Sequence, residues 1–163
     1  MNYRTPAEIM ELAGRVLSLA APWLTVPESV RTGDAEPQRV PVEPGERWEQ
    51  AVARTVAIER EAVEAGTIAV VVPGSMVQAT SDGLASAGVA HQVASARSDL
   101  GSGVTVLPVE AVKGLEFDAV VVVEPARIVR EAAQGLRSLF VALTRPTQRL
   151  ALVHAEPLPE PLR

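Results

Sequence analysis

Residues 103–125 read GVTVLPVEAVKGLEFDAVVVVEP, and this stretch decides the fold. Two short apolar runs, residues 104–109 and 119–123, flank the segment Lys-Gly-Leu-Glu-Phe at 113–117. Uninterrupted Val-rich runs of this length are typical of strands buried on both faces, as in parallel sheets covered by helices. Sites in such sheets lie at strand ends, so the segment between the runs is the first candidate for a site.

The rest of the chain alternates between strand and helix patterns. A helix is expected to start with Thr5 as N-cap and Pro6 in its first turn, with Glu8 completing a capping box. Further helices are expected at 48–65, 75–87 and 135–143, and further strands at 39–42, 67–72, 89–94 and 149–154. This alternation predicts one α/β domain over residues 1–156, a parallel sheet with helices on both faces. A Pro-rich connector is expected at 22–46 and a disordered tail at 157–163.

Composition excludes several classes of function. The chain has 163 residues, no cysteine and only two histidines, so thiolate metal sites and cysteine catalysis are excluded and no metal site is expected. No apolar run is long enough to span a membrane and no signal peptide is evident, so a soluble, cytoplasmic protein without a membrane partner is expected. The net charge of -5 argues against a chain that binds nucleic acid by itself.

Lys113 is the only lysine in the sequence, and its setting excludes a P-loop. A P-loop needs lysine directly after a glycine-rich turn, whereas Lys113 follows Ala111-Val112. ATP hydrolysis of the RecA type requires that loop and an acidic ligand for Mg²⁺. We therefore expect that the isolated chain neither binds nor hydrolyses ATP.

Three segments taken together resemble a known family. Asn-Tyr-Arg-Thr-Pro at 2–6, the Lys113 segment, and Leu-Phe-Val-Ala-Leu-Thr-Arg at 139–145 are similar to motifs IV, V and VI of the UvrD/Rep-like superfamily 1 DNA helicases. The resemblance implies the second, C-terminal RecA-like domain of an ATP-driven motor. The first RecA-like domain, with the P-loop, ATP and Mg²⁺, would then be an N-terminal part of the same polypeptide.

The same resemblance implies roles for individual residues. Arg4 and Arg145 would be catalytic, reaching the phosphates of ATP from across the domain cleft, with Arg145 as the arginine finger. Glu116 would accept a hydrogen bond from the ATP ribose, and Gly114 would allow close approach of the backbone. Lys113 is grouped with these two as a nucleotide-binding residue.

Each assignment has a simpler alternative from the residues alone. Arg4 could be a solvated charge, and the Lys113 segment could be a tight turn between strands. Arg145 could simply be an arginine at the C-terminal end of the helix before it, where a cation interacts favourably with the helix dipole. Arg149 could assist Arg145 or have a surface role.

Two departures from the UvrD/Rep pattern favour the HelD branch of the superfamily. The position of a DNA-coupling histidine is occupied by Glu110, and 108 residues between Arg4 and Lys113 leave no room for a large inserted domain. HelD-like motors act on RNA polymerase, so the implied partners are RNA polymerase or DNA. The alternative from another class is a non-catalytic RecA-like docking module in a transcription or repair complex.

The motor interpretation also makes a geometric prediction. Arg4, Glu116 and Arg145 must lie on one edge of the sheet, within about 15 Å of each other, because one nucleoside triphosphate must reach all three. Sites in open α/β sheets lie outside the carboxyl ends of the strands, so we expect the three residues at the carboxyl edge of the sheet.

Overall fold

The computed structural model describes residues 5–25, 36–94 and 103–163. Its centre is a six-stranded sheet in the order β1-β6-β5-β2-β4-β3, and all pairings are parallel. The strands are β1 (Gln38–Pro41), β2 (Ile68–Val72), β3 (Gln92–Val93), β4 (Val104–Pro108), β5 (Phe117–Val123) and β6 (Pro146–His154). The expected parallel α/β sheet is therefore confirmed. Within the described ranges, no helix has the length and apolarity needed to cross a membrane.

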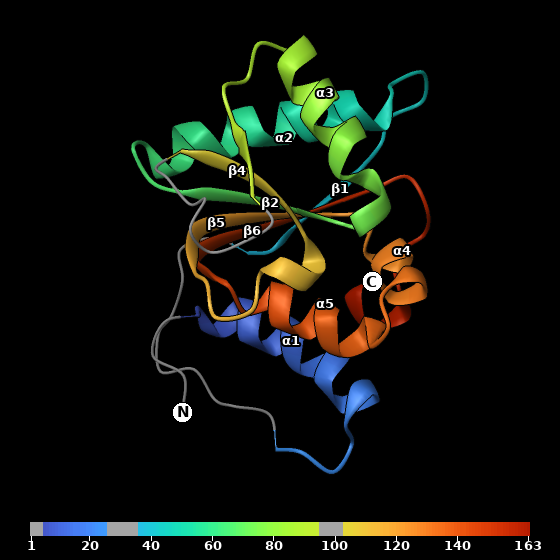
Figure 1. The fold of residues 1–163 in the computed structure, drawn as a ribbon. Helices are drawn as coiled ribbons and strands as arrows, with labels where there is room; N and C mark the ends of the chain where they lie inside the picture. The colour runs from blue at the N-terminus through green and yellow to red at the C-terminus, as the bar shows by residue number, and fades with distance from the viewer. Residues whose placement is uncertain (1–4, 26–35, 95–102) are drawn as a thin grey trace.

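Helices cover both faces of the sheet (Figure 1). The helices α2 (Trp48–Val63) and α3 (Val77–Ser86) lie on one face, and α1 (Ala7–Ala20), α4 (Pro125–Glu131) and α5 (Gly135–Leu143) lie on the other. Short 3-10 turns occur at η1 (Gly74–Met76), η3 (Val109–Ala111) and η4 (Glu160–Leu162).

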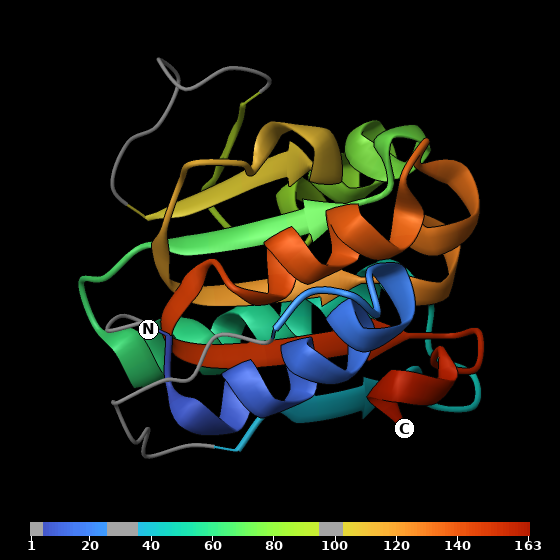
Figure 2. The ribbon, with the colours of Figure 1, turned by 90° about the horizontal axis from the view of Figure 1, so that it is seen from below.

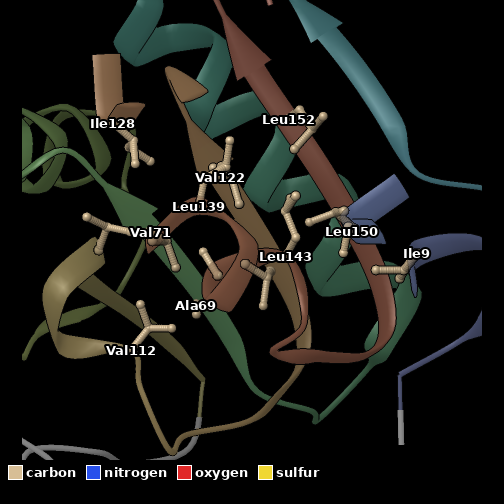
Figure 3. Packing of buried hydrophobic residues seen from close by; sticks show 14 of the residues in the cluster. Ile9, Ala69, Val71, Val112, Val122, Ile128, Leu139, Leu143, Leu150 and Leu152 are labelled. Atoms are coloured by element: carbon tan, nitrogen blue, oxygen red, sulfur yellow. The ribbon is translucent and has the colours of Figure 1, made fainter. Parts of the chain in front are cut away.

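The core consists of two apolar layers divided by the sheet. Alternate residues of the central strands point to opposite faces, so Val120 and Val122 join the α1/α5 layer while Val121 and Val123 join the α2/α3 layer. Figure 3 shows the first layer, where Leu139 and Leu143 of α5 pack against β5 and β6. Burial on both faces explains why the central strands are continuous apolar runs.

Three local expectations need correction. Helix α1 starts one residue later than expected, with Pro6 as its N-cap, and the hydroxyl of Thr5 donates a hydrogen bond to the carbonyl oxygen of Thr144. Helix α4 was not expected at all. Residues 157–163 are packed rather than a disordered tail, because Leu158 and Leu162 are buried in the α1/α5 layer.

Candidate functional site

The segment between β4 and β5 brings the candidate residues to the amino ends of two strands. Because β4 and β5 are parallel, the chain must return from the carboxyl end of β4 to the amino end of β5 before β5 can start. The turn η3, with Glu110, stays at the carboxyl end of β4, and residues 112–116 complete the return (Figure 2). Glu116 therefore directly precedes β5, and Arg145 directly precedes β6.

The expectation of a site at the carboxyl edge of the sheet is therefore wrong, because Glu116 and Arg145 lie at the amino edge. The expected grouping of these two residues on one edge is found. Phe117 and Pro146 are register partners at the starts of β5 and β6. Glu116 therefore lies beside the start of β6, and Arg145 lies beside the start of β5. Figure 2 shows the end of α5, the start of α1 and the starts of both strands on the same side of the molecule. The physical reason is the crossover after β4, which carries the motif away from the carboxyl edge.

Arg145 holds the loop before β5 with its main chain and its side chain. The backbone N–H of Phe117 donates to the carbonyl oxygen of Arg145 at 3.1 Å, and Nη1 of Arg145 donates to the carbonyl oxygen of Leu115 at 3.1 Å. Glu116 lies between these two bonded residues. The position of its backbone is therefore tied to Arg145.

The guanidinium of Arg145 also contacts the end of α5. Nε donates to the carbonyl oxygen of Val141 at 3.0 Å, and Nη2 donates to Oγ1 of Thr144 at 3.0 Å. The first bond keeps the cation at the C-terminal end of α5, in agreement with the simpler alternative of a favourable interaction with the helix dipole. The contact with Leu115 adds what that alternative does not predict, a direct link to the Lys113 segment.

Burial lowers the pKa of the Arg145 guanidinium, and the negative charge of Glu116 partly opposes this shift. An arginine retains its charge in proteins despite such a shift, since its ordinary pKa is far above neutrality. Arg145 is therefore a partly buried cation close to a carboxylate. A group of this kind can bind an anion without first losing a full hydration shell.

The other residues of the Lys113 segment divide into core and surface positions. Leu115 and Phe117 are buried in the α1/α5 layer, whereas Lys113, Gly114 and Glu116 are exposed. Gly114 has φ of +79°, a left-handed conformation that favours glycine over residues with a side chain. The glycine is thus required by the backbone turn, and the turn presents its polar neighbours to solvent.

The start of α1 joins the same edge through Thr5. This residue is 1% exposed, and its hydroxyl donates to the carbonyl oxygen of Thr144 at 3.0 Å. Arg4 lies outside the described residues. The distance prediction for Arg4 is therefore untested, although its neighbour in the sequence contacts the end of α5.

Arg149 does not belong to this edge. Its Nε donates to Oε2 of Glu59 at 2.6 Å, and Glu59 is a residue of α2 on the other face of the sheet. Thr144, to which the family resemblance assigned no role, does belong to this edge. The signal for Thr144 was present in the sequence, as the residue before the candidate finger, but its hydroxyl contacts depend on how α5 ends.

Other chemistry is not evident in the described part of the chain. No group of three or more His, Cys, Asp or Glu residues there could hold a metal ion. A cavity of about 450 Å³ between the start of α2 and α3 is lined by residues such as Arg47, Asp82 and Ser86. None of the candidate residues lines it, so we assign it no role.

Comparisons with known proteins agree with the family resemblance over part of the chain. Residues 103–153 match the family model of the UvrD-like helicase C-terminal domain. This range includes Lys113, Gly114, Glu116 and Arg145, and it excludes the start of α1. No curated protein is significantly similar to the chain.

Among solved structures, the C-terminal domain of a possible DNA helicase from Lactobacillus plantarum WCFS1 has a TM-score of 0.75 at 22% identity. The match covers 99% of this chain and 92% of that one, so the fold is shared over nearly the whole length. The arterivirus nonstructural protein 10 helicase, solved with DNA, has a TM-score of 0.47 at 19% identity and covers 72% of this chain and 28% of that one. The DExH-box NTPase HrpB of E. coli has a TM-score of 0.45 at 18% identity and covers 89% of this chain and 23% of that one. Neither of the last two likenesses supports a conclusion.

The all-parallel sheet and the first of these structures together confirm a single domain of the RecA-like α/β type. Over residues 103–153 the chain matches the UvrD-like helicase C-terminal domain, and over nearly its whole length it has the fold of the C-terminal domain of a possible DNA helicase.

Proposed function

We propose that this chain is the C-terminal motor domain of an ATP-dependent superfamily 1 DNA helicase-like protein. In this proposal the domain completes an ATP site whose P-loop and Mg²⁺ ligand belong to an N-terminal RecA-like domain of the full-length protein. The observation that carries the proposal is the hydrogen bond between Arg145 and the Leu115 carbonyl, which joins the two candidate motifs at one edge.

The donors of Arg145 suit a phosphoryl group. A guanidinium has five N–H groups, and the three bonds to Val141, Thr144 and Leu115 use three of them, which leaves two. Within the described part of the chain these two have no partner. Two N–H groups on a rigid plane match the spacing of two phosphate oxygens, so Arg145 could compensate the charge that develops on the transferring group.

The residues beside Arg145 would bind the rest of the nucleotide. The carboxylate of Glu116 is exposed next to the finger, and a carboxylate is the natural acceptor for ribose hydroxyl groups. Gly114 keeps the backbone there free of a side chain, and Lys113 adds an exposed positive charge for the phosphates. Arg4, directly before Thr5, would be the second cation that contacts the phosphates.

ATP and Mg²⁺ would be held mainly by the P-loop domain. The only lysine of this chain is outside a P-loop context, and the described residues contain no carboxylate cluster for a metal. Hydrolysis would then depend on closure of the two domains, and opening and closing would move the partner that they hold.

A HelD-like motor that acts on RNA polymerase or DNA in the cytoplasm is the finer form of this proposal. Glu110 is exposed at the carboxyl end of β4, in the place of a DNA-coupling histidine. A carboxylate there repels a phosphate backbone, and the net charge of the chain is -5. These charges suit a protein partner such as RNA polymerase better than a tracked DNA strand.

The first prediction concerns Arg145. In the full-length protein, Arg145→Ala should lower kcat for ATP by about 10³-fold or more, because the finger stabilises the transition state. Arg145→Lys should also be strongly impaired, since lysine lacks the planar donor fork. Steady-state ATPase assays measure both, with Arg137→Ala, on the same helix, as the control that should remain active.

An Arg145→Ala protein with the wild-type ATPase rate would contradict the arginine finger. A wild-type full-length protein without any ATPase activity would contradict the motor and favour the non-catalytic docking module.

A further inference from the structure

Thr144 lies at the centre of the contacts that join α1, α5 and Arg145. It is the C-cap residue of α5, and its hydroxyl donates to the carbonyl oxygen of Val141 at 2.8 Å. The same hydroxyl oxygen accepts a hydrogen bond from Nη2 of Arg145. The backbone carbonyl oxygen of Thr144 accepts another from the hydroxyl of Thr5. A single residue thus connects three segments of the candidate site.

Two of the three acceptors of Arg145 are set by the end of α5. The carbonyl oxygen of Val141 accepts from both the Thr144 hydroxyl and Nε of Arg145. The hydroxyl of Thr144 has its proton committed to Val141, so its oxygen faces Nη2 as an acceptor. The Val141 carbonyl and the Thr144 hydroxyl therefore form a pair that holds neighbouring nitrogens of the guanidinium.

This arrangement restricts rotation of the guanidinium. Acceptors for Nε and Nη2 on α5, together with the Leu115 carbonyl for Nη1, fix the plane at three nitrogens. Without the Thr144 hydroxyl, Nη2 would lose its acceptor and the plane would be held at two nitrogens only. The direction of the two remaining N–H groups would then be less defined.

We propose that Thr144 is the positioning residue of Arg145, whose hydroxyl fixes the guanidinium plane so that two N–H groups stay available for the phosphoryl oxygens of ATP. This inference rests on the proposed function, because it assigns a purpose to the orientation of the finger. Thr144 itself would not contact the nucleotide. Its effect is preorganisation, which removes the need to orient the finger during the reaction.

The hydrogen bond from Thr5 links α1 to the same group of contacts around Arg145. Thr5 is buried and donates to the Thr144 carbonyl, so the start of α1 is attached to the residue that orients Arg145. Loss of either hydroxyl should therefore loosen the edge, but only loss of the Thr144 hydroxyl removes a direct partner of Arg145.

The test is Thr144→Val in the full-length protein, since valine has nearly the shape of threonine and lacks the hydroxyl. We expect kcat for ATP to fall by about 10- to 100-fold, as expected for a misplaced catalytic group, with KM for ATP nearly unchanged. Thr144→Ser keeps the hydroxyl and should restore most of the rate. Thr55→Val is the matched control, because the Thr55 hydroxyl also donates to a helix carbonyl, that of Ala51, but on the other face of the sheet.

A second measurement on the 163-residue chain does not depend on ATP hydrolysis. By NMR, the Nη protons of Arg145 should give separate signals in the wild-type chain, in Thr144→Ser and in Thr55→Val, because rotation about the Nε–Cζ bond is hindered. In Thr144→Val these signals should merge.

The outcomes separate the two proposals. A full-length wild-type protein without ATPase activity contradicts the proposed function. An active protein in which Thr144→Val has the wild-type kcat, or changes only KM, overturns the positioning role. Unchanged Arg145 signals in the Thr144→Val chain overturn it as well.

Discussion

Arg145 and Arg149 are four residues apart and lie in different surroundings. Arg145 precedes β6 and remains at the edge of the sheet, where it contacts the loop before β5. Arg149 is inside β6, and its side chain reaches α2 to pair with Glu59, which is 2% exposed. The sequence showed two arginines near a motif, but only the course of the strand distinguishes a candidate finger from the partner of a buried carboxylate.

The Arg149–Glu59 pair leads to a prediction about stability. Arg149→Met should lower the free energy of unfolding by about 3 kcal/mol, because it leaves the buried carboxylate of Glu59 without its cation. Arg130→Met is the control, since Arg130 pairs with Glu156 at the surface, where water screens the charges, and its loss should lower the free energy of unfolding far less. Urea denaturation of both variants gives the comparison.

Adding Glu59→Gln to Arg149→Met should recover part of the loss, since the buried group is then neutral. Equal losses in the Arg149 and Arg130 variants would contradict the assignment of Arg149 to a buried ion pair.

At the scale of elements, the sequence predicts the central strands well and the connections poorly. Residues 68–72 and 119–123 are found as strands because burial on both faces demands continuous apolar runs. Helix α4 was missed because it has only seven residues and follows Glu124, whose φ of 51° is uncommon for a residue with a side chain. That conformation accompanies tertiary contacts, in which the Glu124 carboxylate accepts hydrogen bonds from the backbone N–H groups of Ala155 and Glu156.

The candidate site, too, could be predicted from the sequence only in part. The grouping of Glu116 with Arg145 could be predicted from the order of the motifs, whereas the edge could not. The edge depends on the return of the chain after β4, and no local pattern in residues 109–116 specifies that path. The positions of Thr5 and Thr144 depend in turn on how the ends of α1 and α5 meet.

The junction of α4 and α5 leads to a prediction about packing. A Cβ atom on Gly135 would lie 2.0 Å from the carbonyl oxygen of Val129, so Gly135→Ala requires the two helices to separate. We expect a loss of about 3 kcal/mol in the free energy of unfolding, as for other overpacked positions. Gly74→Ala is the control, because the nearest atom to its Cβ, Oε2 of Glu110, would be 3.8 Å away.

Thermal unfolding followed by circular dichroism compares the two glycine variants. A Gly135→Ala chain as stable as Gly74→Ala would show that the α4–α5 junction is not tightly packed.

At the scale of the whole molecule, the two edges of the sheet differ in the availability of their positive charges. At the amino edge, the three described hydrogen bonds of Arg145 all go to uncharged oxygens, those of Val141, Leu115 and Thr144. At the other edge, Arg127 pairs with Glu131 and Arg130 pairs with Glu156. The amino edge is therefore the better candidate for an anionic ligand, which under the proposed function is a nucleotide presented by a second domain.

The most direct test is a structure of the full-length protein with Mg²⁺ and a non-hydrolysable ATP analogue. We expect the guanidinium of Arg145 to lie within hydrogen-bonding distance, about 3 Å, of an oxygen of the terminal phosphate. We also expect the Glu116 carboxylate to lie near the ribose. A nucleotide bound to the P-loop domain with the amino ends of β5 and β6 turned away from it would contradict the proposed role of this edge in binding ATP.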